Sequence, residues 1–140
     1  MHIPINREMA LKACTSMRSF HSELIDLYDK HGMNLASNRG RRNILMSAPM
    51  EHFLAEAIKD FFPNVVCDGR TGEADITVHS DSESIEIECK LTSPHQSSGS
   101  IAFQTDHDTL ANKGSLDYVY IIADADFEGF CVIYFKGLTI

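Results

Sequence analysis

The stretch GEADITVHSDSESIEIECK, residues 72–90, decides the fold because it alternates like the two strands of a hairpin. Apolar and polar residues take turns in ADITV and again in SIEIECKL. Alternation with a period of two gives each strand one apolar face for a core and one polar face. The polar face carries Asp75, Glu88 and Lys90, and these charges need an explanation.

The turn of this hairpin determines which charged residues face each other. A two-residue loop formed by Asp81 and Ser82 places Asp75 directly opposite Glu88, with Lys90 two residues further along the same face. Residues opposite each other have Cβ atoms about 4.5–5.5 Å apart, and like charges there are destabilising. A raised pKa or a cation must offset the repulsion, and two carboxylates at an open site suit a hard divalent ion such as Mg²⁺.

Helical periodicity dominates the first half of the chain. Apolar residues at three- and four-residue steps predict a long amphipathic helix over residues 5–31 and a second helix over 49–61. Ser47 is a suitable cap for the second helix, and Pro49 suits its first turn. Between them, GMNLASNRGRRN (32–43) is rich in Gly, Asn and Ser and predicts a basic loop.

The second half has the composition of short strands. Gly, Asp and Ser clusters separate runs rich in β-branched and aromatic residues, and a short helix is predicted over 105–114. The predicted strands are NVVCDG, ADITVHS, SIEIECKLT, YVYIIAD and FCVIYFKGL. The order predicts one α/β domain over residues 1–140, with a central mixed five-stranded sheet flanked by helices. An N-terminal helix and basic loop (1–46) precede an α/β core (47–140).

Composition limits the function. The formal charge of -8 argues against binding nucleic acid through bulk electrostatics, which depends on Lys and Arg. No apolar run reaches the roughly 20 residues that span a bilayer, and the N-terminus has no signal-peptide pattern, so we expect a cytoplasmic protein with no membrane partner. The four cysteines lack metal-ligand spacing and lie in apolar segments, which predicts buried free thiols.

GEADI and EIECK resemble the bipartite motif of the PD-(D/E)xK nuclease superfamily. Asp75 takes the place of its first acid, Glu88 of its second acid and Lys90 of its lysine, while Ala74 stands where the pattern has proline. The resemblance covers about residues 47–124. It implies a restriction-endonuclease-like core for the catalytic part of the chain, with the long N-terminal helix as an addition.

The resemblance implies a metal-dependent DNA endonuclease, of the restriction type, that hydrolyses phosphodiester bonds. Asp75, Glu88 and the backbone carbonyl of Cys89 would hold Mg²⁺, for which Mn²⁺ can substitute. Lys90 would orient or help deprotonate the attacking water and offset charge on the phosphate. The superfamily also has an acid on the helix before the sheet, and Glu51, at the edge of the apolar stripe, is the candidate.

Further residues complete the expected site. Gln104 precedes the short helix, where some superfamily members carry a functional glutamine. The candidates for contacts with the DNA backbone are Arg39, Arg41, Arg42 and Arg70. Cleavage of both strands of a duplex favours a homodimer, with the helix over 5–31 as a candidate interface. The alternatives are a non-catalytic interaction or immunity module on the same fold, and a junction resolvase or nuclease toxin domain.

Overall fold

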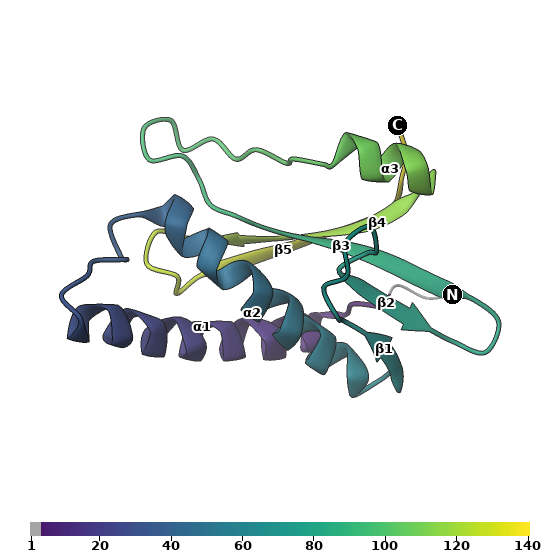
Figure 1. Cartoon of the computed structure of the whole chain (residues 1–140), viewed down its shortest axis with the longest axis horizontal. Helices are drawn as coiled ribbons and strands as arrows, with labels where there is room; N and C mark the ends of the chain where they lie inside the picture. The colour runs from purple at the N-terminus through teal and green to yellow at the C-terminus, as the bar shows by residue number, and fades with distance from the viewer. Residues whose placement is uncertain (1–3) are drawn as a thin grey trace.

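The computed structural model describes residues 4–140, in which helices cover both faces of one sheet (Figure 1). The elements are α1 (Arg7–Lys30), α2 (Arg39–Lys59), β1 (Asn64–Val66), β2 (Ile76–His79), β3 (Ser84–Thr92), α3 (His107–Lys113), β4 (Leu116–Ala123) and β5 (Phe130–Leu138). Figure 1 shows α1 and α2 below the sheet, and α3 with the segment before it above the sheet. No helix in this part of the chain has both the length and the apolar character that crossing a membrane requires.

The sheet has five strands in the order β1-β2-β3-β4-β5. Neighbours are antiparallel except for β3 and β4, which are parallel. A parallel pair needs a long crossover, and the chain supplies it with the segment that carries α3. The mixed five-stranded sheet and the α/β class predicted from the sequence are therefore confirmed.

The β2–β3 hairpin has the predicted register. Ile76 pairs with Ile87, and the Ser80 amide donates to the Glu83 carbonyl at 2.9 Å across the two-residue loop. One residue beyond the end of this ladder, Asp75 comes opposite Glu88. The two-residue loop sets this register. The apolar pattern supports it, because a slip of one residue would turn the apolar side chains of a strand away from the core.

The main core lies between the sheet and the helices α1 and α2. Buried side chains from both helices pack against the apolar faces of β2, β3 and β4, including Met17, Met46, Met50, Leu54, Ile58, Ile76, Val78, Ile87 and Val119. A smaller cluster lies under α3 and contains Leu110, Leu116, Tyr118 and Tyr120. The polar face of the hairpin is thus on the side of α3, away from the main core.

The start of the second helix differs from the prediction. Residues 39–43, which were expected in a basic loop, form the first turn of α2, and the boundary proposed between residues 46 and 47 falls inside this helix. Asn38 caps the helix by accepting a hydrogen bond from the Arg41 amide at 3.0 Å. The Asn, Ser and Gly content indicated a loop, but asparagine is also among the best N-cap residues.

Ser47 and Pro49 lie inside α2 and do not start it. The Ser47 hydroxyl donates to the Asn43 carbonyl at 2.7 Å, four residues earlier, as hydroxyls inside helices often do. Proline normally ends a helix because it lacks an amide hydrogen. Here the buried side chains of Met46 and Met50, on either side of Pro49, hold the helix on the core, so packing outweighs this cost.

The four cysteines are all free, as predicted. Cys14 and Cys89 are buried and Cys67 is half-buried. Cys131 is exposed, and its predicted burial is wrong. It lies on the edge strand β5, where alternate side chains face away from the core.

Candidate active site

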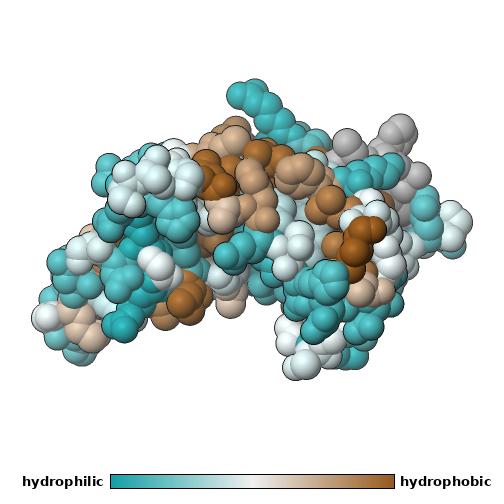
Figure 2. Space-filling view, turned by 90° about the horizontal axis from the view of Figure 1, so that it is seen from above, coloured by the Kyte–Doolittle hydropathy of each residue, from teal (hydrophilic) through white to brown (hydrophobic). Residues whose placement is uncertain are grey.

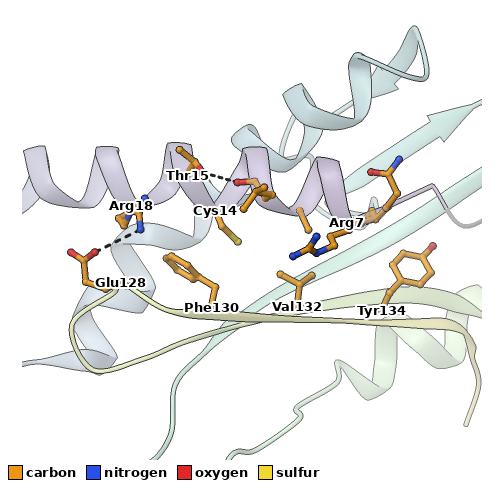
Figure 3. Close-up of a pocket in the computed structure, with 12 residues that line it drawn as sticks. Arg7, Cys14, Thr15, Arg18, Glu128, Phe130, Val132 and Tyr134 are labelled. Atoms are coloured by element: carbon orange, nitrogen blue, oxygen red, sulfur yellow. Dashed lines mark hydrogen bonds and ion pairs between the residues drawn. The ribbon is translucent and has the colours of Figure 1, made fainter.

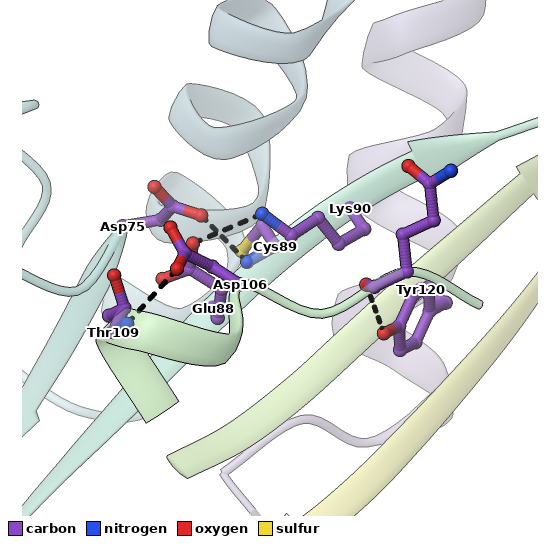
Figure 4. Close-up of polar contacts among 8 residues, drawn as sticks. Asp75, Glu88, Cys89, Lys90, Asp106, Thr109 and Tyr120 are labelled. Atoms are coloured by element: carbon purple, nitrogen blue, oxygen red, sulfur yellow. Dashed lines mark hydrogen bonds and ion pairs between the residues drawn. The ribbon is translucent and has the colours of Figure 1, made fainter. Parts of the chain in front are cut away.

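Asp75 lies where β2 separates from β3. Its carboxylate accepts a hydrogen bond from the Cys89 amide at 2.8 Å (Figure 4). The paired residues of β2 and β3 end at Ile76 and Ile87, so the Asp75 carboxylate supplies the Cys89 amide with an acceptor beyond the end of the ladder. In an extended strand the N–H and C=O of one residue point to the same side, so the Cys89 carbonyl is expected on the side of β2, as its amide is.

Glu88 and Lys90 lie on the same polar face, two residues apart on β3. The Lys90 ammonium donates to the Glu88 carboxylate at 3.2 Å, and Figure 4 shows the Lys90 side chain extending toward Asp75 and Glu88. Glu88 is only 9% exposed. The structure therefore brings together the two acids and the lysine selected from the sequence.

Glu51 joins this group electrostatically from α2. Burial, followed by the negative charges of Asp75 and Glu88, raises the pKa of Glu51 to about 7. Burial also raises the pKa of Asp75, and burial with the charge of Asp75 raises that of Glu88. Ionisation is therefore unfavourable for all three carboxyl groups, a pattern that many functional sites show.

Lys90 does not neutralise this cluster by itself. Burial opposes its charge, but the negative charge of Glu88 and the hydrogen bond to it outweigh burial and raise the pKa of Lys90. The ammonium therefore stays protonated near neutral pH. In this state it can donate hydrogen bonds and offset negative charge.

The residues present fit a hard divalent cation in chemistry and charge. Asp75, Glu88, Glu51 and the Cys89 carbonyl offer oxygen ligands, which Mg²⁺ and Mn²⁺ prefer. Burial disfavours the charged form of all three acids, and a bound cation would offset this cost. Within residues 4–140 no three His, Cys, Asp or Glu side chains form a ready-made metal-binding group. Asp75 and Glu88 are instead engaged by the Cys89 amide and Lys90.

The segment before α3 adds a residue that the sequence did not indicate. Asp106 caps α3 by accepting a hydrogen bond from the Thr109 amide at 3.0 Å, and its charge interacts with those of Glu88 and Lys90. The short helix was predicted over residues 105–114, whereas it spans His107–Lys113, and Asp106 is its N-cap. Asp106 therefore adds negative charge to the edge of the site.

Gln104 is close to the site through its backbone. Its carbonyl accepts a hydrogen bond from the Tyr120 hydroxyl at 2.6 Å (Figure 4). Tyr120 pairs in register with Lys90 on the neighbouring strand. The Gln104 side chain is exposed, so a role for it remains a prediction.

Arg42 differs from the expected DNA contact. It is 1% exposed, and its guanidinium donates to the Ala125 carbonyl at 2.6 Å and to the Ser93 hydroxyl at 2.9 Å. It also donates to the Asp124 carbonyl at 3.2 Å and lies 5.0 Å from the centre of the Phe127 ring. A side chain held in this way cannot contact a phosphate, so Arg42 is a structural residue joining α2 to the β4–β5 turn.

The other arginines lie nearer the surface. Arg41 is exposed on the first turn of α2, and Arg39 donates to the Pro94 carbonyl at 3.0 Å. Arg70 pairs with Asp68 at 2.6 Å while its side chain stays 76% exposed. These three remain candidates for phosphate contacts.

A separate groove of about 530 Å³ lies between α1 and the edge strand β5 (Figure 3). Apolar side chains such as Phe130 and Val132 line it, and an Arg18–Glu128 ion pair of 3.9 Å closes one side. It contains none of the residues of the acidic site, by which we mean Asp75, Glu88, Lys90 and Glu51. The groove therefore does not contribute to the chemistry considered above.

Comparison with protein-family models, with curated proteins and with solved structures finds no significant match for this chain. The function is therefore inferred from the residues of the acidic site and from their geometry.

Proposed function

We propose that the protein is a metal-dependent DNA endonuclease of the restriction type, which hydrolyses phosphodiester bonds. The observation that carries the proposal is the convergence of Asp75, Glu88 and Lys90 at the point where the hairpin strands separate. Glu51, whose pKa is raised to about 7 beside these groups, adds a third acid from α2. This is the arrangement that the resemblance to the PD-(D/E)xK nucleases leads one to expect.

Each residue has a distinct role in this proposal. Asp75, Glu88 and the Cys89 carbonyl would hold the cation, and Glu51 would bind it directly or through water. Bound Mg²⁺ would supply positive charge against the phosphate oxygens and favour attack by water. Lys90, which is protonated near neutral pH, would orient that water and offset the negative charge that develops on the phosphate.

The proposal is tested by plasmid cleavage with the unmodified protein and with Lys90→Ala. The unmodified protein should cleave DNA in Mg²⁺ or Mn²⁺ and not in EDTA. Lys90→Ala should keep its circular dichroism spectrum, because the side chain lies on the polar face, and should lose about 100-fold or more in rate. Lys30→Ala, an exposed lysine at the end of α1, is the matched control and should cleave normally.

A non-catalytic interaction module is the second candidate function. The charge of -8 favours it, and so does the engagement of Asp75 and Glu88 by the Cys89 amide and by Lys90. If Lys90→Ala cleaves as fast as the unmodified protein, or if neither protein cleaves, this module becomes the better proposal.

Cutting both strands of a duplex also leads us to propose a homodimer. Leu11 and Leu27 on α1 are 63% and 52% exposed, which suits a helix that contacts a second copy. Light scattering should give twice the mass of the chain at high micromolar concentration, and a monomer there would remove the proposal.

A further inference from the structure

Three aromatic rings form a cluster on the face of the sheet that lies on the side of α3. The centres of Phe103 and Tyr120 are 5.0 Å apart, those of Tyr120 and Phe135 5.7 Å, and those of Phe103 and Phe135 6.0 Å. Tyr120 is only 1% exposed, whereas Phe103 is 47% and Phe135 36% exposed. The Tyr120 ring is thus buried beneath the cluster, and the rings of the two phenylalanines are partly exposed to solvent.

Strand pairing places this aromatic cluster beside the acidic site. Lys90 is in register with Tyr120 on the next strand. Glu88 is in register with Tyr118, which is in register with Phe135. Phe135 is therefore in the same cross-strand row as Glu88, two strands away, which corresponds to about 10 Å.

The aromatic cluster is not part of the main core, which lies on the opposite face under α1 and α2. Figure 2 looks onto the face that α3 and the segment before it cover only partly, and shows hydrophobic side chains along its middle between hydrophilic ends. Ile101, two residues before Phe103, is also 37% exposed. Exposed rings beside a charged site indicate a ligand with flat, apolar faces.

Unpaired nucleobases fit this surface better than duplex DNA does. Bases in a duplex are stacked inside it, and their faces cannot reach a protein ring, whereas unpaired bases stack on exposed aromatic side chains. The charge of -8 and the burial of Arg42 leave few cations for phosphate contacts. Base stacking would supply affinity that does not depend on a basic surface.

We infer that Phe103 and Phe135 form a stacking site for unpaired bases next to the acidic site, so that the protein cleaves DNA at places where the duplex is locally unpaired. The inference rests on the proposed nuclease function and specifies its substrate class.

The test is fluorescence anisotropy with labelled oligothymidine, oligouridine and duplex DNA, each of about 12 nucleotides, in EDTA at low salt. Oligothymidine should bind at least about fivefold more tightly than the duplex. Phe103→Leu and Phe135→Leu, which keep an apolar side chain but remove the ring, should each weaken this binding about tenfold. The oligouridine arm shows whether RNA uses the same site.

Phe61→Leu is the matched control, because Phe61 is also 47% exposed but lies in the turn after α2, outside the aromatic cluster. It should bind oligothymidine like the unmodified protein. The inference is overturned if oligothymidine and duplex bind equally, or if the Phe103 variant binds like the control. It is also overturned if Phe103→Leu changes only the mass measured by light scattering, since a second copy would then cover the surface.

The two proposals fail separately in these experiments. Cleavage that requires Lys90, with oligothymidine binding unaffected by the Phe103 variant, keeps the nuclease and removes the stacking site. Ring-dependent binding of oligothymidine without cleavage in Mg²⁺ removes the nuclease and leaves a binding surface for unpaired bases.

Discussion

Arg42 and Glu51 lie on the same helix, and both place a charged group in a largely covered environment, yet their surroundings are opposite. The Arg42 guanidinium has backbone and hydroxyl acceptors and an aromatic ring around it. Glu51 instead meets the negative charges of Asp75 and Glu88, which with burial raise its pKa to about 7. Arg42, whose charge has hydrogen-bond partners, stabilises the fold. Glu51, whose charge lies near other negative charges, indicates a site for a cation or a substrate.

The largest expected effect on stability is that of removing Arg42. Arg42→Ala should lower the free energy of unfolding by about 3–5 kcal/mol, because the Ala125 and Asp124 carbonyls would lose a charged partner inside the protein. Urea denaturation followed by circular dichroism measures this change. Arg41→Ala is the control: the neighbouring arginine is exposed, and its loss should cost no more than about 0.5 kcal/mol. Equal losses for the two variants would contradict a structural role for Arg42.

Removing the charge of Glu51 is expected to have a smaller effect on stability, and a stabilising one. The pKa of Glu51 is about 7 in the folded protein against an ordinary value of 4.5, so the folded state keeps a proton that the unfolded state has lost between these pH values. Ionising Glu51 therefore costs stability as pH rises from 4.5 to 7, and the full cost is present above pH 7. Allowing for solvent screening, Glu51→Gln should stabilise the metal-free protein by about 1–2 kcal/mol at high pH.

The pH dependence of this gain is the sharper test. Urea denaturation should show the gain at pH 8 and lose it below pH 4.5, where Glu51 is protonated in both states. Glu56→Gln is the control on the same helix, because the hydrogen bond from Lys59 lowers the pKa of this exposed group. It should give no stabilisation at either pH. A destabilising Glu51→Gln at pH 8 would show that Glu51 has a partner in the folded protein.

The hairpin shows how far local rules extend. Alternation and loop length were sufficient to predict the strands, the register and the meeting of Asp75 with Glu88, because each depends on neighbours within one turn. The start of α2 was not predictable in the same way. Its Asn, Gly and Arg residues suit a loop as well as a capped helix, and tertiary packing of Met46 decides between them.

The arginines show where local rules fail. Arg39, Arg41 and Arg42 are indistinguishable by composition, and only the position of the β4–β5 turn, over 80 residues away along the chain, buries Arg42. One signal was present: Arg42 precedes Met46 by four residues and so continues the apolar stripe of α2. Asp106 was missed for a related reason, because its approach to Glu88 depends on the crossover between β3 and β4.

The claim that the acidic cluster is a cation site is tested most directly by isothermal titration calorimetry with Mn²⁺. The unmodified protein should bind Mn²⁺, and Asp75→Asn should lose that binding while keeping its circular dichroism spectrum, because a neutral amide is a weaker ligand for a hard cation. Binding of Mn²⁺ to Asp75→Asn as tight as to the unmodified protein, or no binding to either, would contradict the claim.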